Sequence, residues 1–298
     1  MYINPYNNIK EGTAAWLQAN FHTHAGTGTG TCGEHEINEV IKYYKMAGYD
    51  VLSISNHDLY SDLSEYQKEF DITLINGFEY SIDKHMLCIG GNCLILDTHQ
   101  KTIDECNKQG GFVVLCHPKW AAGEYWPLKD IDAITGYIGV EIINTVIFKL
   151  SGTGLATEAW DYLLSQGKLV WGFGNDDFHR WYDMARAWNL IYAHKSRQKI
   201  LEAVFNGEFY VSTGLKLSNF QFDQKVLKIK ACSLNNYRDT FKYLFIGKDG
   251  EILKEQCGEH AEYIFNGSEL YVRVQVISDY GAMLWTQPIY DENRFNKA

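Results

Sequence analysis

The sequence of 298 residues predicts an α/β domain over residues 1–214 and a small antiparallel β-sandwich over residues 215–298. In the first part, apolar runs of strand length alternate with amphipathic segments of helix length, joined by short loops. This alternation is typical of a parallel sheet or barrel. After residue 214 the pattern changes to short alternating polar and apolar runs, separated by turn-like segments. That second pattern is typical of an antiparallel sandwich.

The expected strands of the α/β part are apolar runs that end in polar or glycine-rich segments. The run at 112–116 is apolar throughout, as expected for a strand buried on both faces. The run at 137–143 is similar but contains Glu141. In order, we expect strands at 16–21, 51–55, 72–75, 85–89, 112–116, 137–143, 169–173 and 187–193.

The expected helices carry apolar residues at a spacing close to 3.6. In residues 36–47, Ile37, Val40, Ile41 and Tyr44 share one face, and Gly48 supplies the stop that glycine often provides. The other expected helices cover 61–70, 98–109, 155–166 and 196–205. In the C-terminal part, we expect strands at 220–222, 226–230, 243–246 and 270–276, with turns at 248–250 and 266–268.

Composition excludes several classes of function. Lys plus Arg number 27 and Asp plus Glu number 37, which gives a net charge of -10. Such a chain is a poor candidate for non-specific binding of nucleic acid or anionic membranes. No apolar run is long enough to span a membrane, and no signal-peptide pattern is seen at the start, so we expect a cytoplasmic protein. The seven cysteines contain no Cys-x-x-Cys pair, which favours reduced thiols.

Histidines recur where the apolar runs end. His22 and His24 follow the first run, and alternation in a strand points both imidazoles to the same side, where they can hold one cation. In parallel α/β folds the carboxyl ends of the strands meet at one face, where the site forms. His85 opens its strand instead of closing it. The residues expected at this face are His22, His24, His57, Glu79, His117, Asp177 and His179.

This set predicts a multinuclear metal site. Imidazole together with carboxylate suits Zn, Mn or Fe ions. Six histidines and two carboxylates are too many for a single ion with an open position, so we expect two to three divalent ions with a bridging carboxylate. One histidine at a strand end is usually an ordinary polar residue, and only the repetition argues for a site. His35, His99, His194 and His260 are expected at the surface or in supporting positions.

The charge of such a site favours a small anionic substrate. Divalent ions outweigh the two carboxylates, bind phosphate and lower the pKa of bound water. Lys119 and Arg180 each lie close to an expected ligand and are the candidate substrate-binding residues, although each is equally explained as a solvated surface charge. Asp58 and Asp176 are expected to orient imidazoles. The sequence leaves the oligomeric state open.

A glycine motif in the loop after the first strand has a plainer interpretation. Gly28, Gly30 and Gly33 match the dinucleotide fingerprint G-x-G-x-x-G. The nucleotide site needs an acid at the end of the next strand, and here that strand closes on Ser55-Asn56-His57. We therefore expect a flexible loop over the end of a strand.

The ordered motifs resemble the PHP (polymerase and histidinol phosphatase) family of metallohydrolases over residues 14–214. The resemblance implies a distorted seven-stranded (β/α) barrel with a two- or three-metal site. Residues 208–214 and 282–289 look like the carbaryl-hydrolase-like branch, which carries an appended β-sandwich. The motifs are His22-Thr23-His24, Asn56-His57-Asp58, Gly77-Phe78-Glu79, His85, His117-Pro118 and Asp177-Phe178-His179.

The resemblance also implies roles for these residues. Glu79 would bridge two ions, the first held with His22, His24 and Asp177, and the second with His85 and His117. His57 and His179 would belong to a third ion, and His57, Asp177 and His179 are the expected catalytic residues. Where the family usually supplies an acid or histidine to the third ion, this sequence has Thr29. The third ion is therefore weak, absent, or completed by water or a neighbour such as His35.

Three functions follow from these expectations. The first is a metal-dependent phosphoesterase that hydrolyses a small phosphomonoester or nucleotide through a metal-activated hydroxide. The alternative is a carboxylic or carbamate ester hydrolase that uses the same multinuclear site, with aromatic residues lining the substrate pocket. The third is a non-catalytic binding protein, in which the metals are structural and the β-sandwich recognises a partner or glycan.

Overall fold

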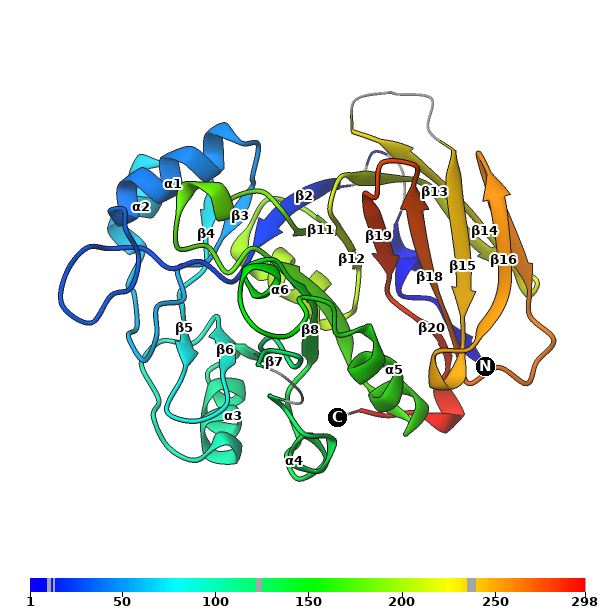
Figure 1. Ribbon diagram of the computed structural model, residues 1–298, viewed down its shortest axis with the longest axis horizontal. Helices are drawn as coiled ribbons and strands as arrows, with labels where there is room; N and C mark the ends of the chain where they lie inside the picture. Colours follow the sequence, from blue (N-terminus) through cyan, green and yellow to red (C-terminus); the bar gives the residue numbers. More distant parts are fainter. Residues whose placement is uncertain (10–11, 13, 122–124, 235–239, 298) are drawn as a thin grey trace.

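The computed structural model describes residues 1–9, 12, 14–121, 125–234 and 240–297 of the chain. Figure 1 shows helices and short strands on one side of the molecule and long antiparallel strands on the other. The mixed α/β class predicted from the sequence is confirmed, with more strand than helix.

The largest sheet has eleven strands and runs through both parts of the chain. Its path is β1-β20-β18-β19-β12-β11-β2-β3-β4, and β15 and β16 branch from β18. These strands are β1 (Tyr2–Ile3), β2 (Ala15–Asn20), β3 (Val51–Leu52), β4 (Thr73–Leu74), β11 (Trp188–Ala193), β12 (Phe209–Ser212), β15 (Phe241–Ile246), β16 (Ile252–Gly258), β18 (Tyr271–Ser278), β19 (Met283–Thr286) and β20 (Ile289–Asp291). At one edge, β1 is antiparallel to β20, with Tyr2 opposite Asp291.

A second sheet of five strands has the order β10-β8-β7-β6-β5. The pairs β7–β8 and β8–β10 are parallel, whereas β6 is antiparallel to both β5 and β7. Its strands are β5 (Gly77–Tyr80), β6 (Met86–Ile89), β7 (Phe112–Leu115), β8 (Gly139–Asn144) and β10 (Trp171–Asn175).

The two sheets face each other across an apolar core. Phe21 after β2, Phe112 of β7 and Phe173 of β10 meet there, with ring centroids 5.5 to 6.2 Å apart. All three rings are fully buried. Among the described residues, only isolated bridges such as His57 with Glu79 and Thr23 with Phe178 join strand ends of the two sheets. A closed seven-stranded barrel is therefore not seen, and that detail stays a prediction.

Helices cover the outside of the α/β part (Figure 1). In α1, Val40, Ile41 and Tyr44 are buried, and Gly48 follows the helix with a φ of 89° that a residue with a side chain rarely adopts. The predicted helices are present with slightly shorter bounds, and α4 was not predicted. The helices are α1 (Ile37–Met46), α2 (Ser64–Glu69), α3 (His99–Lys108), α4 (Leu128–Asp132), α5 (Thr157–Ser165) and α6 (Arg197–Phe205), with 3₁₀ turns η1 (Pro5–Asn8), η2 (Ile147–Lys149), η3 (Trp181–Asp183), η4 (Lys248–Gly250) and η5 (Glu292–Arg294).

The C-terminal part contains a three-stranded antiparallel sheet that packs on the large sheet. Leu217, Leu227 and Ile229 of this sheet share one apolar cluster with Tyr243 and Val274 of the large sheet. The division predicted after residue 214 falls between β12 and β13 and stays a prediction. The three strands are β13 (Leu215–Asp223), β14 (Val226–Ser233) and β17 (Ala261–Ile264), and a separate pair joins β9 (Lys168–Leu169) with β21 (Asn296–Lys297).

Two expectations about the whole chain can be compared with the structure. All seven cysteines are free, as their number and spacing predicted. In the described part of the chain, we find no helix with the length and apolar character needed to cross a bilayer.

Candidate metal centre

The structure brings together all eight residues that the sequence predicted as metal ligands. His22 and His24 follow β2, His57 follows β3, and Glu79 lies in β5. His117 follows β7, and Asp177 and His179 follow β10. The ends of strands from both sheets therefore supply one cluster, in which the ligand atoms of each group lie within 4.8 Å of one another.

His85 joins the cluster because its strand runs the other way. Since β6 is antiparallel to its neighbours, its first residue lies at the same edge as the last residues of the parallel strands. His85 immediately precedes β6, and its Nδ1 lies 2.9 Å from Oε1 of Glu79. A histidine that opens a strand thus reaches the same place as histidines that close theirs.

Glu79 presents one carboxylate oxygen to each of two groups of ligands. Its Oε1 lies 2.9 Å from Nδ1 of His85 and 3.2 Å from Nε2 of His117. Its Oε2 lies 3.3 Å from Nε2 of both His22 and His24 and 2.8 Å from Nδ1 of His57. This is the arrangement expected of a carboxylate that bridges two cations.

The spacing of the first group fits a metal ion. Nε2 of His22 and Nε2 of His24 each lie 3.2 Å from Oδ1 of Asp177. Each also lies 3.3 Å from Oε2 of Glu79. Donor atoms about 2.1 Å from one ion at tetrahedral angles would be about 3.4 Å apart. The protein therefore holds these four donors at nearly the separation that a shared ion requires.

Unsatisfied polar atoms give an independent test of this fit. Buried side-chain nitrogen and oxygen atoms nearly always have a hydrogen-bond partner, because leaving one unpaired costs free energy. Fourteen such atoms in the described residues make no hydrogen bond, and seven of them belong to the predicted metal ligands. They are His22 Nε2, His24 Nδ1 and Nε2, His57 Nδ1, Glu79 Oε2, His117 Nδ1 and Asp177 Oδ1.

The pKa shifts indicate that positive charge is favoured in the cluster. Burial alone would lower the pKa of His22, but the carboxylates of Asp177, Glu79 and Glu141 raise it well above its usual value. Burial raises the pKa of Glu79 and Asp177, yet the neighbouring imidazoles, with His22 first, hold both pKa values well below their ordinary range. Protons and divalent cations can supply this charge in competition.

Glu141 is a site residue whose role the sequence analysis did not predict. It is fully buried in β8, and its Oε1 lies 2.8 Å from Nδ1 of His22. Its other oxygen accepts the backbone N–H of His117 at 2.9 Å and the side-chain amide of Asn144 at 2.9 Å. A carboxylate behind a ligand histidine fixes the ring orientation and leaves the other nitrogen free for a metal. The sequence did contain a signal for this role, because Glu141 is a charged residue inside an apolar run. Buried carboxylates are almost always paired with another group.

Cys32 is the second residue that the sequence analysis missed. Its sulfur belongs to a group with ligand atoms of His24, His57 and His179. Burial raises the pKa of the thiol, but the neighbouring imidazoles of His179, His24 and His57 lower it from 9.0 to about 4. The sequence feature that could have identified Cys32 is its position in the same loop as Thr29. His35, the neighbour considered for this role, instead stacks on Trp181 with ring centroids 3.8 Å apart.

Two aspartates do not have the role expected of them. Asp58 accepts hydrogen bonds from the backbone and hydroxyl of Ser81, at 2.8 and 2.6 Å. Asp176 accepts the hydroxyl of Tyr44 and the backbone N–H groups of residues 185–187. Both were expected to orient imidazoles, and that expectation was wrong. Asp176 instead holds the loop that carries His179.

The backbone is strained at two of the expected ligands. His117 has a φ of 31° and Asp177 a φ of 56°, in the left-handed region that residues with side chains rarely adopt. Such residues cost about 1–3 kcal/mol each and cluster at functional sites. The strain turns each side chain toward the cluster directly after a buried strand.

The two expected substrate-binding residues lie in exposed ion pairs. Nζ of Lys119 is 3.2 Å from Glu158, and Nε of Arg180 is 2.7 Å from Glu34. Arg180 also donates to the hydroxyl of Tyr182 at 2.9 Å. Their role in binding substrate stays a prediction.

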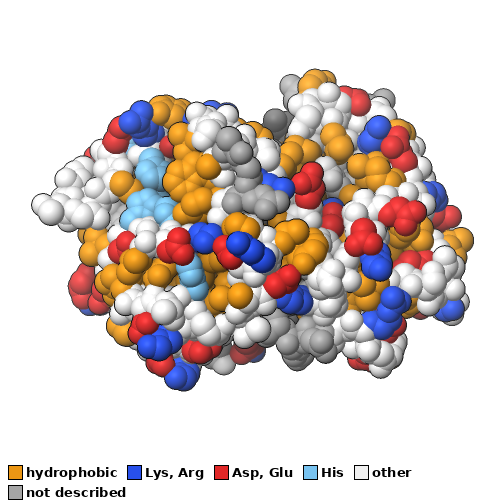
Figure 2. Space-filling view, turned by 60° about the horizontal axis from the view of Figure 1, so that its bottom comes forward, with side chains coloured by type: hydrophobic (Ala, Val, Ile, Leu, Met, Phe, Trp, Pro, Cys, Tyr) orange, Lys and Arg blue, Asp and Glu red, His pale blue; other side chains and the backbone are white. Residues whose placement is uncertain are grey.

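Aromatic residues form a wall beside the second group of ligands. The rings of Trp120 and Tyr125 lie 5.1 and 5.3 Å from that of His117, and 5.5 and 5.6 Å from that of His85. Figure 2 shows histidine side chains at the surface of one face, next to hydrophobic side chains. His57, His179 and His85 are 33%, 26% and 13% exposed, whereas His22 and His24 are fully buried. The cluster therefore has a closed floor and an open side.

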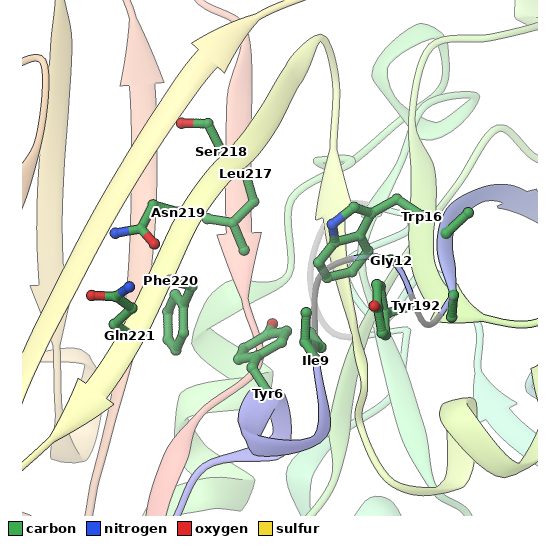
Figure 3. A pocket seen from close by; sticks show the side chains of 12 residues that line it. Tyr6, Ile9, Gly12, Trp16, Tyr192, Leu217, Ser218, Asn219, Phe220 and Gln221 are labelled. Carbon is green, nitrogen blue, oxygen red and sulfur yellow. The ribbon is translucent and has the colours of Figure 1, made fainter.

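A separate cavity of about 510 Å³ lies away from this cluster. Figure 3 shows it lined by Tyr6, Trp16, Tyr192 and Phe220. Trp16 is at the start of β2, and His22 lies six residues further along the chain, or about 20 Å at 3.3 Å per residue. The cavity therefore belongs to the opposite end of the strand from the histidines.

Comparison with solved structures gives one informative likeness. The chain is similar to a two-domain protein from Bacteroides vulgatus ATCC 8482, described as containing a predicted PHP-like metal-dependent phosphoesterase. The TM-score is 0.57 at 16% sequence identity, and the similarity covers 89% of this chain and 90% of that one. At this identity the likeness shows a shared overall fold. No family model and no curated protein matches the sequence.

Proposed function

We propose that this chain is a metal-dependent phosphoesterase that hydrolyses a small phosphomonoester or nucleotide. One observation carries the proposal: seven buried nitrogen and oxygen atoms that make no hydrogen bond belong to the predicted ligands, which gather around Glu79 and Asp177. A protein that retains such costly atoms in one place is built to receive cations there. The shared fold with a PHP-like protein supports the same conclusion.

The residues fall into three ligand groups. His22, His24, Glu79 and Asp177 would hold the first ion, and Glu79 with His85 and His117 the second. His57 and His179 would contribute to a third. When bound, divalent ions such as Zn, Mn or Fe would supply positive charge for the phosphoryl oxygens and lower the pKa of a coordinated water.

The protein's own contribution is to present this charge on one open side. His22, His24 and Glu79 form the buried floor, so an anionic substrate reaches the site past His57, His85 and His179. We assign the catalytic roles to His57, Asp177 and His179, which lie on or next to that side.

Lys119 and Arg180 would bind the substrate phosphate by exchanging partners. Their present partners, Glu158 and Glu34, are 84% and 51% exposed. Exposed ion pairs of this kind are worth about 0–1 kcal/mol, so a phosphate dianion can displace the carboxylates at little cost.

The second candidate is a carboxylic or carbamate ester hydrolase that uses the same site. The aromatic wall of Trp120 and Tyr125 beside His117 favours it, because such a wall suits a planar apolar leaving group. The predicted carbaryl-hydrolase-like branch would agree with this activity. The domain division, the barrel and sandwich details, the cytoplasmic location and the lack of a nucleic-acid partner remain predictions.

Metal analysis and two substrates test the proposal. Protein purified without chelator should hold about two to three ions per chain. With added Mn or Zn it should hydrolyse nitrophenyl phosphate, and His117→Ala should abolish turnover while His260→Ala, at an exposed position, keeps it. Hydrolysis of nitrophenyl acetate alone would favour the ester hydrolase. Tightly bound ions without turnover of either substrate would favour the non-catalytic binding protein.

A further inference from the structure

We infer that Cys32 is a thiolate ligand of the third ion and makes this position selective for a soft divalent ion such as Zn²⁺ over Mn²⁺. The inference rests on the proposed metal centre and adds a ligand that its motifs do not contain. In sequence, the loop has Thr29 where an acid or histidine was expected. In the structure, Cys32 of the same loop lies next to His24, His57 and His179.

The sulfur of Cys32 lies near imidazole nitrogens of three histidines. The ligand atoms of Cys32, His24, His57 and His179 all lie within 4.8 Å of one another. His24 is fully buried, and neither of its ring nitrogens has a hydrogen-bond partner. Its ring packs 4.2 Å from that of His179 and 4.5 Å from that of His57. The loop cysteine is therefore next to unsatisfied buried donors.

His24 belongs to the ligands of the first ion, and Cys32 belongs to those of the third. Nε2 of His24 lies 3.3 Å from Glu79 and 3.2 Å from Asp177, which commits it to the first ion. Cys32, His57 and His179 remain as three protein ligands for the third ion. Three protein ligands with nitrogen and sulfur donors and one open position are typical of a catalytic zinc site.

The path of the loop fixes Cys32 in this position. A Cβ on Gly33 would lie 2.8 Å from Cα of Ala25, so only glycine lets the loop fold back onto the end of the first strand. The N–H of Glu34 donates to the carbonyl of His179 at 3.3 Å, and the N–H of Gly26 donates to His35 at 2.7 Å. The loop is thus tied to the segment that carries His179.

The ligand type determines which ion is preferred. Thiolates favour Zn²⁺ and other soft ions, whereas carboxylates suit Mn²⁺ and Mg²⁺. Cys116 also lies close to His22, Glu79 and His117, but it is fully buried in the apolar core and burial raises the pKa of its thiol. Cys257, which is exposed in β16, offers a matched control.

Cobalt titration of the metal-free protein tests the inference without an activity assay. Wild type should bind the ion with a sulfur-to-cobalt charge-transfer band for one of its sites. Cys32→Ser should lose that band and one equivalent of cobalt, and Cys257→Ser should keep both. Cys32→Asp should regain the lost equivalent without the band, and competition between Zn²⁺ and Mn²⁺ at this site should shift toward Mn²⁺ by more than about tenfold.

The outcomes separate this inference from the proposed function. Cobalt binding without a sulfur band, or an unchanged band and stoichiometry in Cys32→Ser, overturns the role of Cys32 and leaves the other ligands standing. No cobalt binding by folded wild type overturns the metal centre itself. Far-ultraviolet circular dichroism of each variant establishes that the fold is kept, and Cys32→Asp serves if Cys32→Ser does not fold.

Discussion

Two buried charge clusters of this protein differ in how their charges are balanced. Asp161 of α5 accepts hydrogen bonds from Arg273 of β18 at 2.7 and 2.5 Å and from Tyr271 at 2.9 Å, and the guanidinium lies over the ring of Trp160. In the metal centre, by contrast, the ion pairs of Glu79 and Asp177 in the described part of the chain are all with histidines.

The difference separates a self-contained cluster from one that fits bound cations. The Asp161 cluster contains its own permanent cation, so its charges balance within the chain. The metal centre gathers acceptors and titratable rings, so its charge balance depends on protons or bound cations. The following predictions test this difference, from the largest expected effect to the smallest.

The largest effect should come from breaking the self-contained pair. Asp161→Asn leaves Arg273 buried with no counter-charge, which should lower the free energy of unfolding by about 3–5 kcal/mol. Urea denaturation with and without added Zn²⁺ should give the same loss. The double replacement Asp161→Leu with Arg273→Met should recover most of it. A loss below about 1 kcal/mol in the single variant would contradict a permanent pair.

Metal removal should be the next largest effect and should act only on the other cluster. A ligand present at 100 times its Kd stabilises the folded state by about 2.7 kcal/mol. Thermal melts should therefore show a higher Tm with Zn²⁺ or Mn²⁺ than after chelation. The Asp161→Asn variant should show the same rise in Tm on adding metal, because the substitution does not change the metal ligands. Equal Tm values with and without metal in wild type would show that the histidine cluster, like the Asp161 cluster, does not depend on bound cations.

A smaller effect should follow from loosening a ligand without removing it. Glu141→Gln keeps the shape of the side chain but weakens its hold on His22 and should lower metal affinity by about 10–100-fold. Competition with a chromophoric chelator measures this change. Glu105→Gln, an exposed carboxylate paired with Lys108, is the matched control and should match wild type. Wild-type affinity in Glu141→Gln would show that the hydrogen bond to His22 is dispensable.

The smallest effect should be in the pH dependence of the metal-free protein. Burial lowers the pKa of His57 and His179, but Cys32 with Glu79 raises the first to about 10, and Cys32 with Asp177 raises the second to about 9. Both rings then stabilise the fold fully below about pH 6.5, and this contribution is lost as pH rises through about 9 and 10. This contribution to stability is modest, because both imidazole rings are partly exposed to solvent.

Thermal melts across this range give the measurement. The Tm of the metal-free protein should fall between about pH 7 and pH 10, and His57→Asn should reduce the slope. With Zn²⁺ the increment in Tm should grow with pH instead, since binding requires neutral imidazoles. A metal-free Tm that rises over this range would contradict the assigned pKa shifts.

The sequence was sufficient to predict the position of residues that lie at the ends of buried strands. His22, His24, His57, His117, Asp177 and His179 could be placed together because buried strands end at a common edge. His85 was harder, since only the antiparallel direction of β6, set by pairing with β5 and β7, explains its position. That pairing joins residues far apart in the chain and leaves no local signal in the sequence.

Residues placed by loops or by burial could not be assigned in this way. Cys32 reaches the cluster only because Gly33 lets its loop pack on Ala25, and no periodic pattern records that path. Glu141 was visible as a charge in an apolar run, but its contact with His22 depends on β2 facing β8 across the core. Asp176 was placed next to the ligands correctly, yet its backbone partners at 185–187 depend on a later turn.

The pairing of β1 with β20 has a consequence for how the chain is made. Tyr2 finds its partner, Asp291, only after almost the entire sequence between them has been translated. At about 5–20 residues per second, the first strand waits roughly 15–60 s with an open edge. This edge of the large sheet is therefore completed late in biosynthesis, and its register is decided only after residue 291 has left the ribosomal tunnel.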